Sequence, residues 1–322
     1  MQQALALPDD TAALHAGYRQ VLSMLLDPPN VTLRTANKMY VKHSYKILDS
    51  YMDLMKSQYL SEPKSVNFGD SAGTSKLIND DVESLTRGKI KDLIAPNALN
   101  GLVRLVLVNA IYFKGSWQEK FDKQKTQMRD FFCHRANRAV KVNMMHMRGK
   151  RFRCDALAKL GCKALELPYK GGRFSMLLLL PDEKDGLKAL EEKLVNTPVQ
   201  SIMQKLRQEK TNIRIPKFKL EASYDLKEHL KKLGMSELFD IKRANLSKIS
   251  GKNELYVSKL VHKAFIEVNE EGAEAAAATA VICRLRSAPE EFEFFADHPF
   301  FFAIIDNEIG LVLFSGRYVK PQ

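Results

Sequence analysis

Apolar residues recur at three- and four-residue intervals in the first third of the chain, the spacing of one face of an α-helix. This pattern predicts helices over 13–26, 46–60 and 75–94, the last beginning behind serine and threonine caps. Shorter segments with the same spacing predict helices over 186–194, 199–209 and 226–234. Helices are therefore concentrated early and interleaved with other elements later.

Strand-like segments dominate the rest of the chain. Residues 31–42 alternate between apolar and polar, and residues 102–117 are apolar on both faces, which is typical of a strand buried inside a sheet. Further strands are expected at 140–147, 162–169, 173–182, 212–226, 265–271, 292–306 and 309–319. Because no long Gly, Ser or Pro linker interrupts the pattern, we predict one α+β domain over residues 1–322, with large mixed or antiparallel sheets.

Composition and charge limit the classes of binding partner that the chain is expected to have. The chain has 322 residues, 45% of them hydrophobic, so it can bury a large core, and no apolar run reaches membrane-spanning length. The net charge of +12 invites a polyanion, with the densest positive patch at 146–154. No zinc-finger spacing, RNP-like motif or basic region with heptads is present, so we expect neither nucleic acid nor membrane as partner. The patch is interpreted as a solvated strand edge, with weak binding of a sulfated glycan as the alternative.

Cysteines and sequons give weaker signals. Four cysteines lie without CxxC spacing, which predicts no metal site, and no cofactor motif is present; they are Cys133, Cys154, Cys162 and Cys283. Cys154 and Cys162 could pair, but structural, unpaired thiols are the preferred interpretation. Asn30-Val-Thr and Asn245-Leu-Ser are compatible with glycosylation in a secretory compartment.

One string resembles a catalytic motif. Residues 69–73, Gly-Asp-Ser-Ala-Gly, fit the GxSxG pattern of hydrolase nucleophile elbows. That elbow needs a buried apolar strand before the serine, whereas the preceding residues are short and polar. The competing interpretation is that Asp70, Ser71 or Thr74 caps an ordinary helix, and we expect a non-enzyme.

The most unusual stretch is 269–295, NEEGAEAAAATAVICRLRSAPEEFEFF. In an extended segment, alternate side chains share one face, so Ala273, Ala275, Ala277 and Thr279 lie together and all are small. Such a segment could enter a sheet between existing strands without steric conflict. The simpler alternative is a loop of small residues with incidental arginines.

Several segments together resemble the serpin superfamily, over nearly the whole chain. EEGAEAAAATA is similar to the hinge of inhibitory serpins, and FFADHPFFFAIID to the strand that follows their reactive loop. LVLVNAIYFKGSW, LELPYKGGRFSMLLLLPDE and IPKFKLEASYDLKEHLKKLG are similar to core segments of the family. The sequence also has a general likeness to secreted arthropod members of the family. The resemblance implies a serpin fold, with one large mixed sheet, further sheets and surrounding helices.

The resemblance also implies a mechanism. An attacking serine protease would cleave the exposed loop, and the cut loop would insert as a new strand in the main sheet. Counting from Gly272 places the reactive bond between Arg286 and Ser287, which points to trypsin-like targets such as trypsin or thrombin, with Arg284 as a second cleavage point. The hinge would comprise Glu270, Glu271, Gly272, Ala273, Glu274, Ala275, Ala276, Ala277, Ala278 and Thr279.

Four further positions match residues with mechanical roles in that family. Glu270 resembles a hinge-base glutamate whose partner would be Lys217. Asn109 and His262 resemble partners in a polar cluster beneath the sheet opening, and Trp117 the tryptophan at its top. The alternative for each is routine packing or a surface ion pair.

The likeness begins late in the family's sequence, so we expect the chain to be N-terminally incomplete, without the first helices. Localisation is expected to be extracellular, from the sequons and the family. The alternative function is a non-inhibitory binding or carrier protein of serpin fold, or an inactive truncated form.

Overall fold

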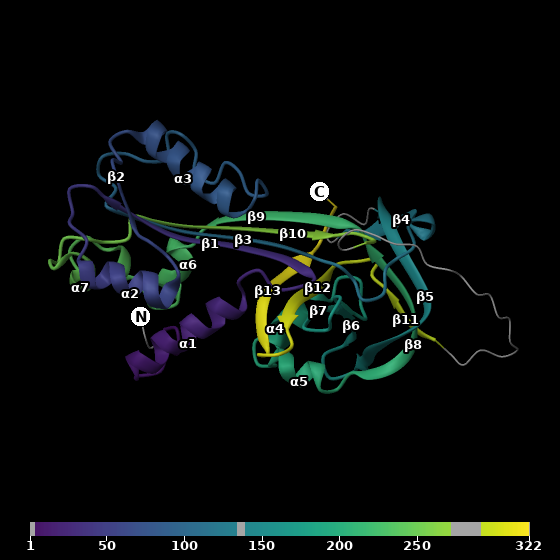
Figure 1. Ribbon diagram of the computed structural model, residues 1–322. Helices are drawn as coiled ribbons and strands as arrows, with labels where there is room; N and C mark the ends of the chain where they lie inside the picture. The colour runs from purple at the N-terminus through teal and green to yellow at the C-terminus, as the bar shows by residue number, and fades with distance from the viewer. Residues whose placement is uncertain (1–3, 134–138, 272–290, 322) are drawn as a thin grey trace, which may run out of the picture. The chain divides into compact units, whose positions relative to one another are not determined.

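The computed structural model describes residues 4–133, 139–271 and 291–321. The chain forms two compact units. The first comprises Met1–Pro28, Thr32–Phe113 and Leu220–Ile266, and the second comprises Pro29–Val31, Lys114–Lys219 and Glu267–Gln322. Each is described by itself, with the labels of Figure 1.

The first unit is built on a five-stranded sheet of order β2-β1-β3-β10-β9. Its strands are β1 (Val31–Lys42), β2 (Lys64–Val66), β3 (Leu105–Gly115), β9 (Phe218–Asp225) and β10 (Lys259–Val268). The residues predicted as a buried strand occupy the centre of this sheet as β3, because apolar side chains on both faces need cover on both faces. β3 and β10 are parallel, in register from Val106 opposite Lys259 to Phe113 opposite Ile266.

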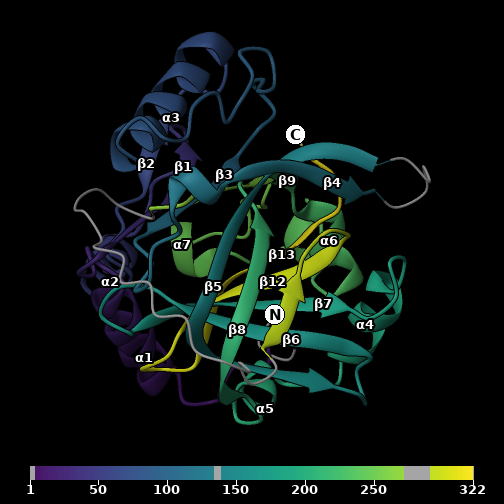
Figure 2. The same ribbon diagram turned by 90° about the vertical axis from the view of Figure 1, so that its right-hand side faces the viewer.

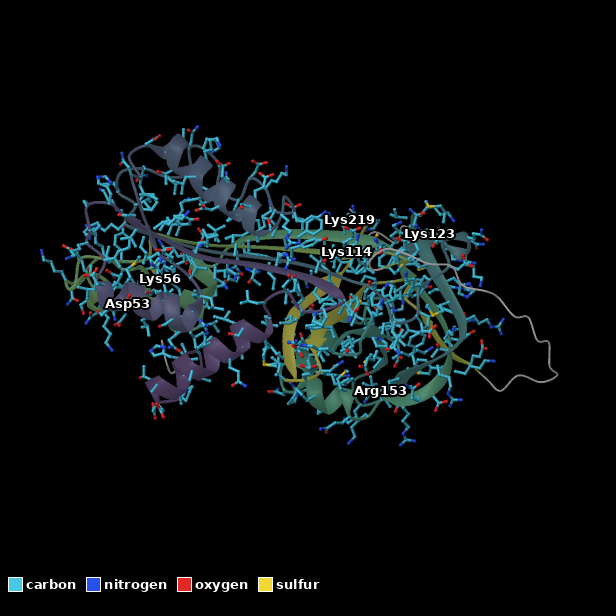
Figure 3. The ribbon with its side chains drawn as sticks, viewed as in Figure 1. Asp53, Lys56, Lys114, Lys123, Arg153 and Lys219 are labelled. Atoms are coloured by element: carbon cyan, nitrogen blue, oxygen red, sulfur yellow. The ribbon has the colours of Figure 1, made fainter. Side chains whose placement is uncertain are left out.

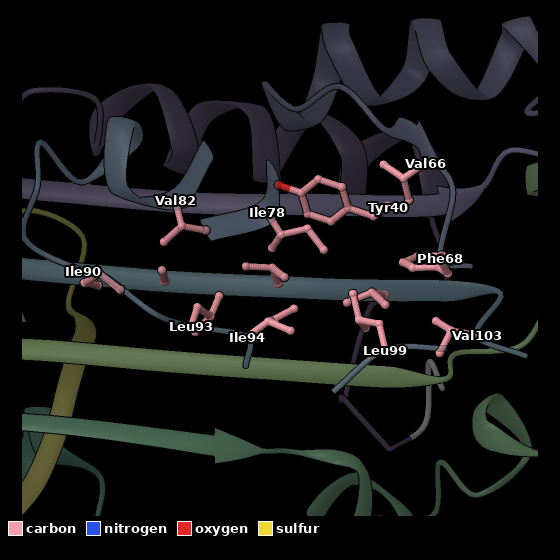
Figure 4. Packing of buried hydrophobic residues seen from close by; sticks show 14 of the residues in the cluster. Tyr40, Val66, Phe68, Ile78, Val82, Ile90, Leu93, Ile94, Leu99 and Val103 are labelled. Carbon is pink, nitrogen blue, oxygen red and sulfur yellow. The ribbon is translucent and has the colours of Figure 1, made fainter. Parts of the chain in front are cut away.

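Most helix ends in this unit lie within a few residues of the predicted ones. They are α1 (Thr11–Met24), α2 (Asp49–Tyr59), α3 (Ser71–Leu85), α6 (Lys227–Lys232) and α7 (Ser247–Ser250), with a short 3₁₀ turn at Glu237–Phe239. Ile78 and Val82 of α3 are fully buried in a cluster with β3 residues such as Val106, and Figure 4 shows several of its members.

The helix predicted over 75–94 is displaced at both ends. It begins at Ser71, where the Asp70 side chain accepts a hydrogen bond from the Gly73 amide, and it ends at Leu85. Thr86 ends it, because its hydroxyl accepts a hydrogen bond from the Ile90 amide, and Gly88 follows with φ of +74°. Ile90 still enters the cluster of Ile78, so the helical spacing of apolar residues continues without a helix.

The second unit contains an eight-stranded sheet of order β11-β8-β5-β6-β7-β12-β13, with β4 paired to β5. Its strands are β4 (Gln127–Phe132), β5 (Ala139–Leu157), β6 (Cys162–Pro168), β7 (Phe174–Pro181), β8 (Arg207–Pro216), β11 (Phe292–Phe295), β12 (Phe300–Asp306) and β13 (Leu311–Tyr318). β11 and β8 are parallel and β5 and β8 antiparallel, so the expectation of mixed and antiparallel pairing is confirmed. Helices α4 (Leu187–Leu194) and α5 (Val199–Met203) and a 3₁₀ turn at Lys123–Lys125 complete the unit.

β5 is much longer than the predicted strand 140–147. It runs beside β8 (Figure 2), and the register of this pair shifts between Arg148 and Lys150. Gly149 at the shift has φ of +79°, a conformation that glycine adopts without a Cβ penalty. The glycine therefore lets one strand continue through a bulge.

The helix predicted over 199–209 is wrong in its second half. Only Val199–Met203 is helical, and Arg207 already begins β8. Ile202 and Leu206 pack into one apolar cluster, the first from the helix and the second from the turn after it. Apolar residues at helical spacing are thus buried here by a short helix and the turn that leads into a strand, and not by one continuous helix. The strand predicted over 212–226 is likewise two strands, β8 and β9, interrupted at Lys217.

Candidate functional site

Glu270 stands at the start of the candidate site, two residues beyond the end of β10. Its side chain is only 6% exposed, and its carboxylate lies 2.9 Å from the Lys217 ammonium. The Thr126 hydroxyl donates to the other carboxylate oxygen over 3.0 Å, and the Phe121 amide donates to the Glu270 carbonyl over 3.0 Å. The chain is therefore held here through both side chain and backbone.

The ionised form of Glu270 is favoured despite its burial. Burial alone would raise its pKa, but hydrogen bonds from Lys217 and Thr126, together with the lysine charge, hold the pKa below its ordinary value of 4.5. The anchor is thus an ion pair at neutral pH. It weakens only as acid protonates the carboxylate.

Trp117 holds the residue before Glu270. Its indole N–H donates to the Asn269 carbonyl over 2.8 Å, and its ring stacks on Tyr169 with the centroids 4.4 Å apart. A Cβ on Gly115 would lie 2.4 Å from the Tyr169 ring, so only glycine permits this close approach at the end of β3. The site requires an aromatic pair and a neighbouring glycine together.

Outer lysines surround two further carboxylates of the same segment. Glu267 lies 3.6 Å from Lys114 and 4.0 Å from Lys219, and Glu271 pairs with Lys123. Figure 3 labels Lys114 and Lys219, which both lie near the Glu267 carboxylate. These lysine side chains are 30%, 66% and 64% exposed, so each pair contributes little beside that of Glu270.

A second anchor stands on the far side of residues 272–290. Glu291 precedes β11, and its carboxylate, 8% exposed, lies 2.6 Å from Arg148 and 3.1 Å from Lys210. The hydrogen bond from Arg148 is the main cause that lowers the pKa of Glu291. Buried carboxylates therefore hold the chain both before and after that stretch.

A polar cluster lies within the five-stranded sheet of the first unit. His262 on β10 faces Asn109 on β3, with His262 Nδ1 and the side-chain oxygen (Oδ1) of Asn109 2.5 Å apart. The Asn109 amide donates to Asn37 of β1, also over 2.5 Å. Burial lowers the pKa of His262, so the imidazole is neutral at physiological pH and carries its proton on Nδ1. The cluster thus links three neighbouring strands through uncharged hydrogen bonds.

Predicted positions elsewhere are more ordinary. Gly272, the alanine run, Arg284, Arg286, Ser287 and Cys283 lie outside the described residues. Asn30 and Asn245 are exposed, and Asn245 accepts a hydrogen bond from the Ser247 hydroxyl within its sequon. The Ser71 hydroxyl donates to the Pro96 carbonyl, an acceptor that cannot act as a base. The helix-cap interpretation of Asp70 is confirmed.

The cysteines and the positive patch singled out in the sequence form no binding site among the described residues. Cys133, Cys154 and Cys162 are free, so Cys154 and Cys162 do not pair, and burial raises the pKa of both of these to about 12. In the dense positive patch, Arg148, Lys150 and Arg153 each pair with a carboxylate. Within the described ranges, no cluster of acidic, histidine or cysteine side chains suits a metal, and no helix is long and apolar enough to cross a membrane.

Sequence reasoning missed four partners. Asn37, Thr126, Tyr169 and Glu291 complete the contacts of residues that it singled out. Asn37 and Tyr169 lie in strand-like segments and Thr126 in a polar turn, and only the fold brings each of them to its partner. The acidic pair Glu290-Glu291 before an aromatic strand was the one available signal for the second anchor.

Three features indicate the class of protein: a sheet in which β3 and β10 run parallel, a second sheet of mixed pairing, and buried carboxylates on both sides of residues 272–290. The family model for serpins, described as serine protease inhibitors, matches residues 1–321. The chain therefore belongs to the serpin family, and its α+β architecture is the serpin fold.

Relatives and solved structures agree. The chain is 42% identical to leukocyte elastase inhibitor A of Rattus norvegicus over 297 residues, 90% of this chain and 78% of the relative. It is 38% identical to serpin B8 of Bos taurus, covering 100% and 86%. The structure matches Serpin48 of the insect Tenebrio molitor with a TM-score of 0.87 at 35% identity, covering 100% and 84%. It also matches uncleaved ovalbumin with a TM-score of 0.82 at 32% identity, covering 97% and 80%.

This family corrects the expectation of a mere non-enzyme. The matched family consists of protease inhibitors, and relatives carry inhibitor names. "Non-enzyme" is therefore replaced by a positive class, membership of a family described as serine protease inhibitors.

The Glu270 anchor generates a stability prediction. Replacing Lys217 by alanine leaves a buried carboxylate without its cation, so we expect the free energy of unfolding to fall by about 1–3 kcal/mol. Replacing Lys219, whose partner lies 4.0 Å away, should change it by less than about 0.5 kcal/mol. Urea denaturation of both variants measures the difference, and equal losses would show that the Glu270 pair anchors nothing.

Proposed function

We propose that the protein inhibits serine proteases as a suicide substrate, cleaved between Arg286 and Ser287, with trypsin-like enzymes as targets. One serpin domain spans residues 1–322, with residues 269–295 as its hinge and reactive-centre loop. The observation that carries the proposal is the pairing of β3 and β10. These strands are parallel, and the proposed hinge follows directly after the end of β10.

The geometry of that pair suits strand insertion. A segment that turns back after β10 runs antiparallel to β10, and therefore antiparallel to β3 as well. It could form hydrogen bonds with both strands once they separate. The small face of Ala273, Ala275, Ala277 and Thr279 then enters the sheet without steric conflict.

The covalent step balances within the protease's own chemistry. The protease serine attacks the Arg286 carbonyl carbon, the Arg286–Ser287 peptide bond breaks, and the new amine of Ser287 takes the proton. Arg286 remains as an ester on the protease. Insertion of the loop then moves this acyl-enzyme before water can hydrolyse it.

Specificity follows from the residue at the proposed bond. A trypsin-like specificity pocket holds an acidic group that pairs with arginine. The relatives from Rattus norvegicus and Homo sapiens are named leukocyte elastase inhibitors. We expect this chain to differ from them in target protease, because it presents Arg286 at the proposed bond. Arg284 supplies a second cleavage point, which would yield cleavage without trapping.

Location and glycans belong to the same proposal. We infer a secreted, extracellular glycoprotein modified at Asn30 and Asn245, both exposed, and similar in this to secreted arthropod serpins. Weak binding of a sulfated glycan to the positive surface is the accompanying expectation. Expression in insect secretory cells should give a product that loses mass on treatment with an N-glycosidase, in two steps that Asn30→Gln and Asn245→Gln remove separately. A product of unmodified mass would contradict the glycosylation.

The test of the function is a denaturing gel. Mixing the chain with trypsin, thrombin or elastase should give a boiling-resistant band with a trypsin-like enzyme, at the summed mass less the released fragment 287–322, and Arg286→Ala should remove it. Arg284→Ala is the matched control and should keep the band. A clipped product without the band would contradict inhibition and favour a carrier of serpin fold.

A further inference from the structure

One face of the eight-stranded sheet carries a row of basic and aromatic side chains. Arg214 of β8 lies directly opposite His146 of β5 and Phe295 of β11, so the three side chains form a row across neighbouring strands. Figure 1 shows these strands next to each other. The row lies on the face opposite to the buried Met145, Ile213 and Phe294, because side chains alternate along each strand.

Arg214 itself is held by stacking. Its guanidinium carbon lies 4.2 Å from the centroid of the Phe295 ring, a cation–π contact. Its Nε is buried and makes no hydrogen bond, and no carboxylate lies within ion-pair distance among the described residues. A guanidinium in this state has lost part of its hydration without gaining a counter-charge.

A second arginine adds to the positive field. Burial, followed by repulsion from Arg129, lowers the pKa of Arg214, and Glu293 offsets only part of this. Arg129 donates to the neutral Gln127 side chain rather than to an acid. By contrast, Arg148 on the same face is neutralised by Glu291. Among the described residues, Arg129 and Arg214 are therefore a pair of arginines with no carboxylate in ion-pair distance, and together with Phe295 we name them the Arg214 patch.

The patch lies close along the chain to the proposed reactive bond. Residues 288–294 separate Ser287 from Phe295, so a fully extended chain spans at most about 28 Å between those two residues. A stable protein complex buries about 20–30 residues on each side, more than a loop tip alone supplies. A protease bound at residues 286–287 must therefore also cover surface next to β11.

We propose that the Arg214 patch is a docking site for an acidic surface of the attacking protease. This inference rests on the proposed function. The planar guanidinium, oriented on Phe295, presents donors to a carboxylate in the bidentate geometry that arginine favours. An acidic protease surface would neutralise the patch on contact. The patch then selects among proteases that share a preference for arginine at the cleaved bond.

The experiment compares association rates with two trypsin isoforms, one of anionic and one of cationic surface. Arg214→Gln should slow formation of the boiling-resistant complex about 3- to 10-fold with the anionic isoform at low salt. The difference should disappear near about 1 M salt, where charges are screened beyond about 3 Å. The cationic isoform should react with the variant at least as fast as with the unmodified chain.

Two further variants serve as controls. Arg207→Gln removes the same charge from the exposed opposite end of β8 and should leave both rates unchanged within about twofold. Arg129→Gln removes the other arginine of the patch without touching the stacking on Phe295, and should reproduce the loss if Arg214→Gln folds poorly.

The outcomes separate the two proposals. If the unmodified chain traps either isoform while the Arg214 and Arg129 variants match Arg207→Gln, the docking site is overturned and the inhibitory function stands. If the unmodified chain traps neither, the proposed function fails and the docking site fails with it. A rate loss confined to the anionic isoform, with an unchanged final yield of complex, supports both.

Discussion

The buried ion pair between Glu270 and Lys217 fixes the point at which the chain leaves β10. Burying a carboxylate is unfavourable unless it is paired and hydrogen-bonded, and here Lys217 and Thr126 meet that requirement, while the Phe121 amide holds the Glu270 backbone carbonyl. Removing one partner leaves the others unable to compensate. The long segment that follows therefore starts from a defined place, and Glu291 fixes where it ends.

The two kinds of polar contact differ in what they allow. Glu270 and Glu291 are buried carboxylates held by ion pairs, and breaking such a pair leaves a buried charge without its partner. The cluster of Asn37, Asn109 and His262 is neutral, and its hydrogen bonds exchange for others at a modest net cost of about 1 kcal/mol each. Strands joined by neutral side chains can part more easily than strands held by buried charge. The proposed entry of a new strand between β3 and β10 would require that combination.

The sequence predicted the elements better than their ends. β3 was recognisable as a central strand because its apolar residues cover both faces, and α1 and α2 because their spacing is regular over several turns. The ends of α3 and α5 were misjudged where Ile90 and Leu206 keep helical spacing while packing from turns. Periodicity reports which residues are buried, and a turn can bury the same residues as a helix.

The candidate site divides in the same way. Glu270, Lys217, Asn109 and His262 could be singled out only through a family resemblance, since no local pattern brings residues more than fifty positions apart to one another. Their partners Asn37, Thr126 and Tyr169 had no such guide. Arg214 escaped notice because a lone arginine in a strand is unremarkable until its neighbours on β5 and β11 are known.

The central claim is that the segment after β10 can become a strand of the five-stranded sheet. The most direct measurement is thermal unfolding of the chain before and after a cut within residues 272–290 by a metalloprotease, which forms no acyl-enzyme. Insertion would add about ten backbone hydrogen bonds, on the order of 10 kcal/mol, so the midpoint should rise by roughly 20 °C. A cut chain that unfolds at the same temperature as the intact one, or below it, would contradict the account.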